Sequence, residues 1–251
     1  MVKYYRTCKS VLAAQASACD PLVPEVTVIV LLFGPPGCGK GTQAASIAQR
    51  FHIPAISTGE MFRAECKAGT DLGRLACSIL KSGGLVGDDV VDQIVAARIR
   101  QPDCASGFLL DGYPRTLEQA TFLDGLMRKL DLPKPVAIHL DVPAQVLVSR
   151  ITARRQCGQC GRIYNMLSQP PKVGGICDAD QAPLIRREDD TEEVILARLK
   201  AYHDATGPVI AYYRGGGCRR VDATGAPAEI AREIERLLVG HAESEAITCP
   251  R

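Results

Sequence analysis

A glycine-rich segment with one lysine is the strongest chemical feature of the sequence. It reads Gly-Pro-Pro-Gly-Cys-Gly-Lys-Gly-Thr over residues 34–42 and follows an apolar run at residues 26–33. Glycines let backbone N–H groups turn toward phosphate oxygens, a following helix adds the positive end of its dipole, and Lys40 can reach the outer phosphates. Gly41 stands where the strict pattern has a hydroxyl residue, and Thr42 comes next. A glycine turn without a ligand is the alternative, but the strand-loop-helix context favours a nucleoside triphosphate site.

A second chemical feature is an acid at the end of another apolar stretch, residues 108–111. An apolar strand that ends in a carboxylate is typical of a Walker B element, which holds Mg²⁺ directly or through its waters. Many strands end in an aspartate at a turn, so Asp111 carries little weight alone. Beside a phosphate loop it predicts a magnesium site.

Three of the eleven cysteines cluster near an aspartate. Cys157 and Cys160 are separated by two residues, and Cys177 and Asp180 repeat this spacing. Two such pairs predict a tetrahedral zinc site, since zinc accepts thiolates and carboxylates. Four protein ligands leave no open position, so the expected role is structural. The alternatives are three free thiols, or a segment held by hydrogen bonds.

The other eight cysteines are spread singly along the chain, which is typical of a reducing compartment and predicts a cytoplasmic protein. Residues 1–25 carry Lys3, Arg6 and Lys9 but no acid before Asp20. We expect an unstructured extension there, with an export or organelle address as the alternative. Residues 240–251 are expected to form an unstructured tail.

The composition limits the function classes. The chain has 251 residues, of which 46% are hydrophobic and 23% are charged, and its net charge is +2. This charge gives no general electrostatic reason to bind nucleic acid or an acidic membrane surface. The apolar run at residues 26–33 is too short for a membrane helix. We therefore expect small-molecule partners, no nucleic acid, no membrane and a monomer.

Periodicity predicts the elements that must position these residues. The pattern indicates strands at residues 26–33, 108–111, 136–140 and 218–222, and helices at 41–51, 71–82, 88–100, 191–203 and 228–239. Asp190 is expected to cap the helix that follows it, with Glu193 completing a capping pair. Strands that alternate with helices predict an α/β fold with a parallel sheet. Residues 154–190 break this alternation and predict a small inserted subdomain.

Four segments, in this order, resemble the adenylate kinase family. They are residues 34–43, Ser-Thr-Gly-Glu-Met-Phe-Arg at 57–63, Asp-Gly-Tyr-Pro-Arg-Thr at 111–116 with Gln119, and Arg-Glu-Asp-Asp at 187–190. The resemblance covers residue 26 to about residue 238. It implies a P-loop NTPase three-layer α/β/α core at residues 26–239 with a central parallel sheet, an AMP-binding helical segment at 57–86, and a small zinc-ribbon-like lid at 153–190. It also implies a phosphotransferase that catalyses the Mg²⁺-dependent reaction ATP + AMP = 2 ADP and serves adenine nucleotide homeostasis.

Phosphoryl transfer between two nucleotides requires alignment and charge neutralisation more than covalent help, so arginines should converge on one cleft. Six candidates lie at turns or element ends: Arg63, Arg115, Arg150, Arg154, Arg187 and Arg198. The resemblance implies that the first two grip the AMP phosphate, the next two contact ATP, and the last two close over the phosphates and AMP. For any single arginine the alternative is a solvated surface charge.

The resemblance also implies the remaining site residues. The catalytic set is Lys40, Arg115, Arg150, Arg187 and Arg198. The ATP contacts are Gly37, Cys38, Gly39, Lys40, Gly41, Thr42, Arg150, Arg154, Ile163, Tyr164 and Gly225. The AMP contacts are Thr58, Arg63, Gly84, Leu85, Val86, Gly112, Tyr113, Pro114, Arg115, Gln119, Arg187 and Arg198, among which Thr58 and Gln119 read the adenine. Asp111 would face the waters of Mg²⁺, and Glu60 either faces the same waters or caps a helix.

Two other functions remain open from the sequence. The same chemistry could act on another pair of nucleotides, with GTP as donor or with UMP or CMP as acceptor. A nucleotide-switched binding protein whose zinc ribbon contacts nucleic acid is the alternative from another class. The net charge of +2 and the scarcity of aromatic residues near the cysteines disfavour it.

Overall fold

A five-stranded parallel sheet forms the centre of the protein. The computed structural model describes residues 27–248 apart from 83–84, 188–189 and 216, so the expected extension at 1–25 lies outside the described residues. The strand order is β2-β3-β1-β4-β8 and every pairing is parallel. The strands are β1 (Val28–Phe33), β2 (Ala55–Ser57), β3 (Gly107–Asp111), β4 (Val136–Asp141) and β8 (Arg219–Asp222). The predicted parallel α/β fold is confirmed.

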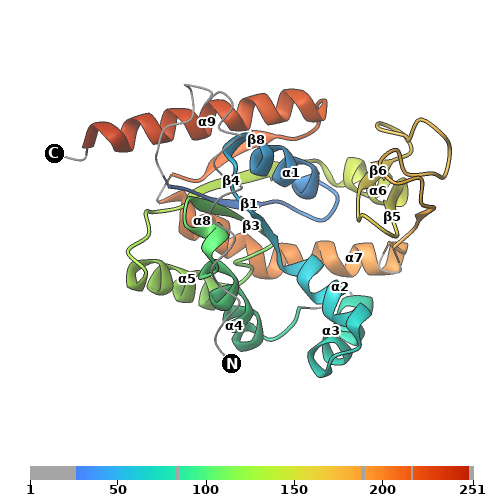
Figure 1. Cartoon of the computed structure of the whole chain (residues 1–251), viewed down its shortest axis with the longest axis horizontal. Helices are drawn as coiled ribbons and strands as arrows, with labels where there is room; N and C mark the ends of the chain where they lie inside the picture. Colours follow the sequence, from blue (N-terminus) through green and yellow to red (C-terminus); the bar gives the residue numbers. More distant parts are fainter. Residues whose placement is uncertain (1–26, 83–84, 188–189, 216, 249–251) are drawn as a thin grey trace, which may run out of the picture.

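Helices cover both faces of this sheet (Figure 1). One face packs against α1 (Lys40–Phe51), α6 (Ala144–Thr152) and α9 (Pro227–Thr248). The other packs against α4 (Asp88–Ile99), α5 (Leu117–Lys129) and α8 (Gly207–Arg214). A five-residue π-helix, Tyr202–Thr206, joins α7 (Glu192–Ala201) to α8. None of the helices within the described ranges has the length and apolarity that crossing a membrane requires.

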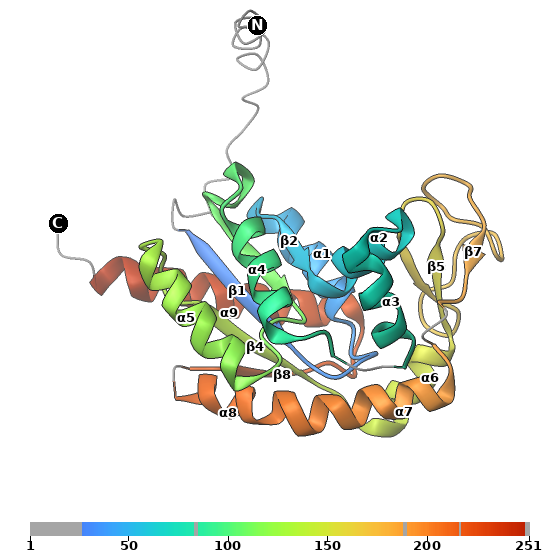
Figure 2. The ribbon, with the colours of Figure 1, turned by 90° about the horizontal axis from the view of Figure 1, so that it is seen from below.

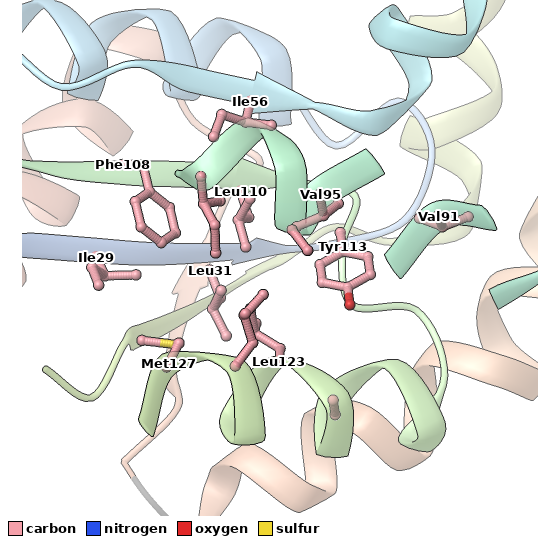
Figure 3. Close-up of a cluster of buried hydrophobic side chains, with 14 of the residues drawn as sticks. Ile29, Leu31, Ile56, Val91, Val95, Phe108, Leu110, Tyr113, Leu123 and Met127 are labelled. Carbon is pink, nitrogen blue, oxygen red and sulfur yellow. The ribbon is translucent and has the colours of Figure 1, made fainter. Parts of the chain in front are cut away.

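The apolar run of β1 is uninterrupted because both of its faces are buried. Ile29, Leu31 and Phe33 belong to the hydrophobic cluster that includes α4, α5 and α8, while the alternate residues Val28, Val30 and Leu32 face α1 and α9. Figure 3 shows Leu31 and Leu110 pointing toward Leu123 and Met127 of α5. This two-sided burial sets the strand ends, and therefore the loops that follow them, in fixed positions.

A helical hairpin projects beyond the carboxyl end of the sheet (Figure 2). It consists of α2 (Thr58–Ala68) and α3 (Asp71–Ser82). The two helices meet closely at Gly73, where a Cβ atom would lie 2.1 Å from the carbonyl oxygen of Glu65. A disulfide joins Cys66 to Cys77. These two cysteines are therefore not isolated thiols, as their scattered positions suggest, because the hairpin brings together residues 11 apart in sequence.

The inserted segment forms a second, smaller sheet at the same end of the molecule (Figure 1). Its strand order is β6-β5-β7, all antiparallel, with β5 at Arg154–Cys157, β6 at Ile163–Asn165 and β7 at Leu184–Ile185. The cluster of buried residues there contains only Cys157, Tyr164 and Cys177 among the described residues. So small an apolar core gives the insert little stability of its own.

Two expected helix ends differ from the structure. Thr191, and not Asp190, caps α7, because its hydroxyl accepts the N–H of Val194. The last helix continues through Gly240 to Thr248, where an unstructured tail is expected, since the alanines and glutamates of this stretch are good helix formers. Residues 249–251 lie outside the described part of the chain.

Candidate active site

A cavity of about 530 Å³ opens at the carboxyl ends of β1 and β3. Its wall includes the glycine-rich loop, the start of α2, the small sheet, α7 and the loop between β8 and α9. Ligands of parallel α/β folds bind beyond the carboxyl ends of the strands. The cavity thus lies where the fold offers a binding site.

The glycine-rich loop connects β1 to α1 in the predicted strand-loop-helix arrangement. Gly37 has φ +83°, and a Cβ atom there would lie 2.5 Å from Cγ1 of Ile151. Gly39, with φ 100°, is the N-cap of α1, so the first N–H groups of this helix face the loop. The ammonium group of Lys40 donates to the carbonyl oxygens of Gly34 at 2.6 Å and Pro35 at 3.1 Å. The loop therefore holds a positive charge and a helix N-terminus at one wall of the cavity.

Cys38 has a packing role within this loop. Its side chain is buried in the cluster that contains Ala44 and Leu140. Burial raises the pKa of its thiol, although the Lys40 ammonium opposes this effect. A neutral buried thiol is a poor nucleophile. The side chain fills space under the phosphate loop.

All six predicted arginines line the cavity, and they come from different elements. Arg115 is the central one, and its Nε donates to the carbonyl oxygen of Gly112 at 2.8 Å. Burial, the Arg198 guanidinium and the Arg63 guanidinium lower the pKa of Arg115, while Asp111 opposes them. Converging like charges favour an anion with several negative oxygens between them.

Arg150 also supports the cavity wall. It lies on α6, and its guanidinium donates to the carbonyl oxygens of Ala223 at 2.7 Å and Thr224 at 3.0 Å. These contacts hold the loop after β8, where Gly225 lines the cavity. The sequence gives no sign of this contact, because the partners are more than 70 residues apart.

A smaller cavity of about 30 Å³ lies beside the main one. Its wall comes from α2, the loop after α3, and α5, and its lining includes Thr58, Leu85, Val86 and Gln119. The hydroxyl of Thr58 donates to the carbonyl oxygen of Gly112 at 3.1 Å. Gly112 and Arg115 line both cavities, so the two spaces are adjacent.

One predicted AMP contact among the described residues is not found at these cavities. Tyr113 lines neither of them, because its ring is buried and its hydroxyl donates to Asp92 at 2.5 Å. Tyr113 therefore packs in the core beneath the site. Gly84 lies outside the described residues. Pro114, Asp111 and Glu60 line the main cavity.

Known relatives of the chain identify its family. A family model described as adenylate kinase matches residues 32–218. The chain belongs to the adenylate kinase family. It is 50% identical over 185 residues to the adenylate kinase of Thermosipho melanesiensis, covering 74% of this chain and 86% of the relative. It is 43% identical over 212 residues to that of Anaeromyxobacter dehalogenans strain 2CP-1, covering 84% of this chain and 99% of the relative.

The family determines the reaction class. This member of the adenylate kinase family is a phosphotransferase of the nucleoside monophosphate kinases, and its reaction is ATP + AMP = 2 ADP. The predictions of family, reaction and enzyme class are confirmed. Adenylate kinases use Mg²⁺ with ATP, and the carboxylate of Asp111 at the wall of the main cavity suits the waters of this ion.

The small sheet brings the four predicted metal ligands together. The ligand atoms of Cys157, Cys160, Cys177 and Asp180 all lie within 4.8 Å of one another. Hydrogen bonds from Cys160 and from the N–H of Ala182 lower the pKa of Asp180, so its carboxylate is ionised. Three sulfurs and one carboxylate fit a tetrahedral zinc ion. Asp178, the less favoured alternative, instead accepts the N–H of Lys172 at 2.9 Å.

Asp190 is the site residue whose role the sequence analysis misses. It is fully buried, and its carboxylate pairs with Arg154 and lies 3.9 Å from Nη1 of Arg198. A buried carboxylate between two arginines fixes their positions at the cavity. The sequence shows only an acid before a helix, for which capping is the ordinary interpretation.

Proposed function

We propose that the 530 Å³ cavity binds ATP and AMP end to end, with ATP on the glycine-rich loop and the adenine of AMP against the side chains that line the smaller cavity. The observation that carries this proposal is the convergence of six arginines and the lysine loop on one cavity that joins a second, mostly apolar one. Gly37–Thr42, with Ile163, Tyr164 and Gly225, suit the donor. Thr58, Leu85, Val86 and Gln119 suit the acceptor base.

The chain's own residues orient the phosphates and neutralise their charge. Lys40 moves from the loop carbonyls to the outer phosphates of ATP, and Arg115 and Arg63 hold the AMP phosphate. Arg187 and Arg198 neutralise charge on the oxygens of the transferring group, where such arginines act most strongly. AMP presents an anionic oxygen at neutral pH, so no general base is required.

The small sheet acts as a lid over this site. Arg154 lies at its base, and Arg187 lies where the chain leaves it. Movement of the sheet toward the glycine-rich loop would bring both arginines onto the phosphates and exclude water as an acceptor. This gives residues 153–190 a role in protecting the transferring group from hydrolysis.

Two metals fit the residues present. Mg²⁺ bound with ATP supplies charge neutralisation on the phosphates, and Asp111 would hold its waters. Zinc supplies a structural cross-link among the three cysteines and Asp180. Because the insert has few buried apolar residues, this cross-link would stabilise the lid.

The cellular setting follows from the same features. We propose a cytoplasmic monomer that balances adenine nucleotides, with no nucleic acid or membrane partner. The net charge of +2 supports this choice, since six of the arginines gather in a cavity that suits small anions. Outside the metal cluster, Cys38, Cys104 and Cys218 are free thiols, which fits a reducing compartment, whereas the disulfide between Cys66 and Cys77 does not add to this support.

A coupled assay of ADP formation tests the nucleotide assignments. ADP formation from Mg·ATP should require AMP, with GMP, UMP and CMP as poor acceptors and GTP as a poor donor. Slow ATP hydrolysis that does not depend on an acceptor, together with salt-sensitive RNA binding, would favour the nucleotide-switched protein instead. Faster turnover with UMP or CMP would move the acceptor assignment to a pyrimidine.

A further inference from the structure

The amide of Gln119 is held at both ends. Its Oε1 accepts the backbone N–H of Arg115 at 2.7 Å, and its Nε2 donates to Oδ1 of Asp88 at 2.7 Å. A backbone N–H can only donate and a carboxylate can only accept, so these partners determine which end of the amide is oxygen and which is nitrogen. The side chain is only 3% exposed, and it lines the smaller cavity.

Asp88 is itself fixed, and it lies behind the cavity wall. It stands in the first turn of α4, and its Oδ2 accepts the hydroxyl of Thr116 at 2.5 Å. Thr116 in turn caps α5 by accepting the N–H of Gln119 at 3.2 Å. Asp88 lines neither cavity, so it would touch a bound base only through Gln119.

We propose that Asp88 is a specificity-determining positioning residue, which locks the Gln119 amide in the orientation that accepts a 6-aminopurine and rejects a 6-oxopurine. The inference rests on the proposed role of Gln119 at the acceptor base. The amide keeps one free N–H on Nε2 and one free lone pair on Oε1. Adenine offers the complementary pair, an acceptor at N1 and a donor at the 6-amino group.

A 6-oxopurine presents the opposite pattern, with a donor at N1 and an acceptor at O6. To bind it, the amide would have to turn over. Oε1 would then face the Asp88 carboxylate, and Nε2 would face the N–H of Arg115. Both existing hydrogen bonds would be replaced by contacts between two acceptors and between two donors. The site would reject a 6-oxopurine strongly, because its binding leaves buried polar groups of the protein unpaired.

The test compares AMP with IMP, which differ only at N1 and at position 6 of the base. Asp88→Asn keeps the side-chain size but can donate as well as accept, so it tolerates the turned amide. We expect the ratio of kcat/KM for AMP to that for IMP to fall by about 10-fold or more. The KM for ATP should stay unchanged. Dissociation constants for AMP and IMP from calorimetry give the same comparison where turnover of IMP is too slow to measure.

The matched control is Asp89→Asn. This neighbour lies in the same first helical turn, is exposed and loses the same charge, so its AMP to IMP ratio should equal that of the unchanged protein. A purely structural role of Asp88 would lower kcat/KM for both acceptors alike. If Asp88→Asn fails to fold, Asp88→Ala, which also removes the lock, should shift the ratio in the same direction.

A third variant separates this inference from the proposed function. Gln119→Leu should raise the KM for AMP. If it does so while Asp88→Asn and Asp88→Ala leave the AMP to IMP ratio unchanged, the locking role of Asp88 is wrong and the role of Gln119 stands. If Gln119→Leu leaves the KM for AMP unchanged, both the locking role of Asp88 and the proposed role of Gln119 are wrong.

Discussion

The hydroxyl of Tyr164 lies 3.4 Å from Sγ of Cys177, while the same residue lines the main cavity. The hydroxyl oxygen also accepts the N–H of Asp178 at 2.8 Å. One side chain therefore connects the metal cluster to the wall of the nucleotide site. A change in the geometry of the cluster would therefore alter the position of Tyr164 at the cavity wall as well as the stability of the insert.

Removing the metal should lower the thermal stability of the protein more than it alters the chemistry of the folded enzyme. Cys157→Ala, or treatment with a chelator, should lower the Tm by several degrees, because the insert has little apolar core. The kcat of the remaining folded enzyme should change less. Differential scanning calorimetry beside the coupled assay measures both, and Cys218→Ala, a free cysteine outside the insert, is the control. Metal analysis of fresh reduced protein that finds well under one zinc per chain would remove the zinc assignment.

Lys40 should be essential for turnover. Lys40→Met removes the ammonium group that neutralises phosphate charge, so kcat should fall on the order of 10³-fold or more, as for other phosphoryl-charge clamps. Lys134→Met, at an exposed lysine that lines neither cavity, should leave kcat unchanged. Near-normal turnover in Lys40→Met would contradict the assigned role.

Local chemistry explains what the sequence predicts well. The phosphate loop and the strand before it are contiguous, so their structure follows from glycine positions and an unbroken apolar run. The cysteine cluster is equally local, because its pairs repeat one spacing. The arginines at the cavity are found through the family resemblance.

Contacts across the chain explain what the sequence does not predict. Asp190 pairs with Arg154, 36 residues away, and Asp88 holds Gln119, 31 residues away. Both acids precede or begin a helix, where capping is the usual reason for an acid. Only the packing of the helices shows that these carboxylates position other side chains.

The disulfide between Cys66 and Cys77 should stabilise the α2–α3 hairpin. A cross-link between residues 11 apart restricts the unfolded chain, an effect of about 3 kcal/mol for a loop of this order. Reductant, or the double change Cys66→Ser and Cys77→Ser, should lower the Tm by several degrees, measured with zinc in excess so that the metal cluster stays loaded. Cys218→Ser, at a free cysteine outside the hairpin, is the control. Equal Tm values with and without reductant would show that the cross-link contributes nothing in solution.

Asp92 should make stability fall as the pH rises. Desolvation raises the pKa of its carboxyl above the ordinary value of 3.8, the Tyr113 hydroxyl opposes the shift, and Asp88 and Asp89 add to it. Between 3.8 and the raised pKa, the folded chain holds a proton that the unfolded chain has released. The stabilisation is therefore complete below 3.8 and is lost as the pH rises through the folded-state pKa.

Asp92→Asn mimics the protonated form at every pH, and its Oδ1 can still accept the Tyr113 hydroxyl. The Tm of this variant relative to the unchanged protein should therefore increase as the pH rises from 3.8 through the raised folded-state pKa of Asp92. Thermal unfolding across this range measures the difference, and Asp131→Asn, an exposed aspartate that does not contribute to the shift of Asp92, controls for the loss of one negative charge. A constant difference at all pH values would mean that Asp92 titrates alike in the folded and unfolded chains, and that its burial costs no more than its hydrogen bond with Tyr113 returns.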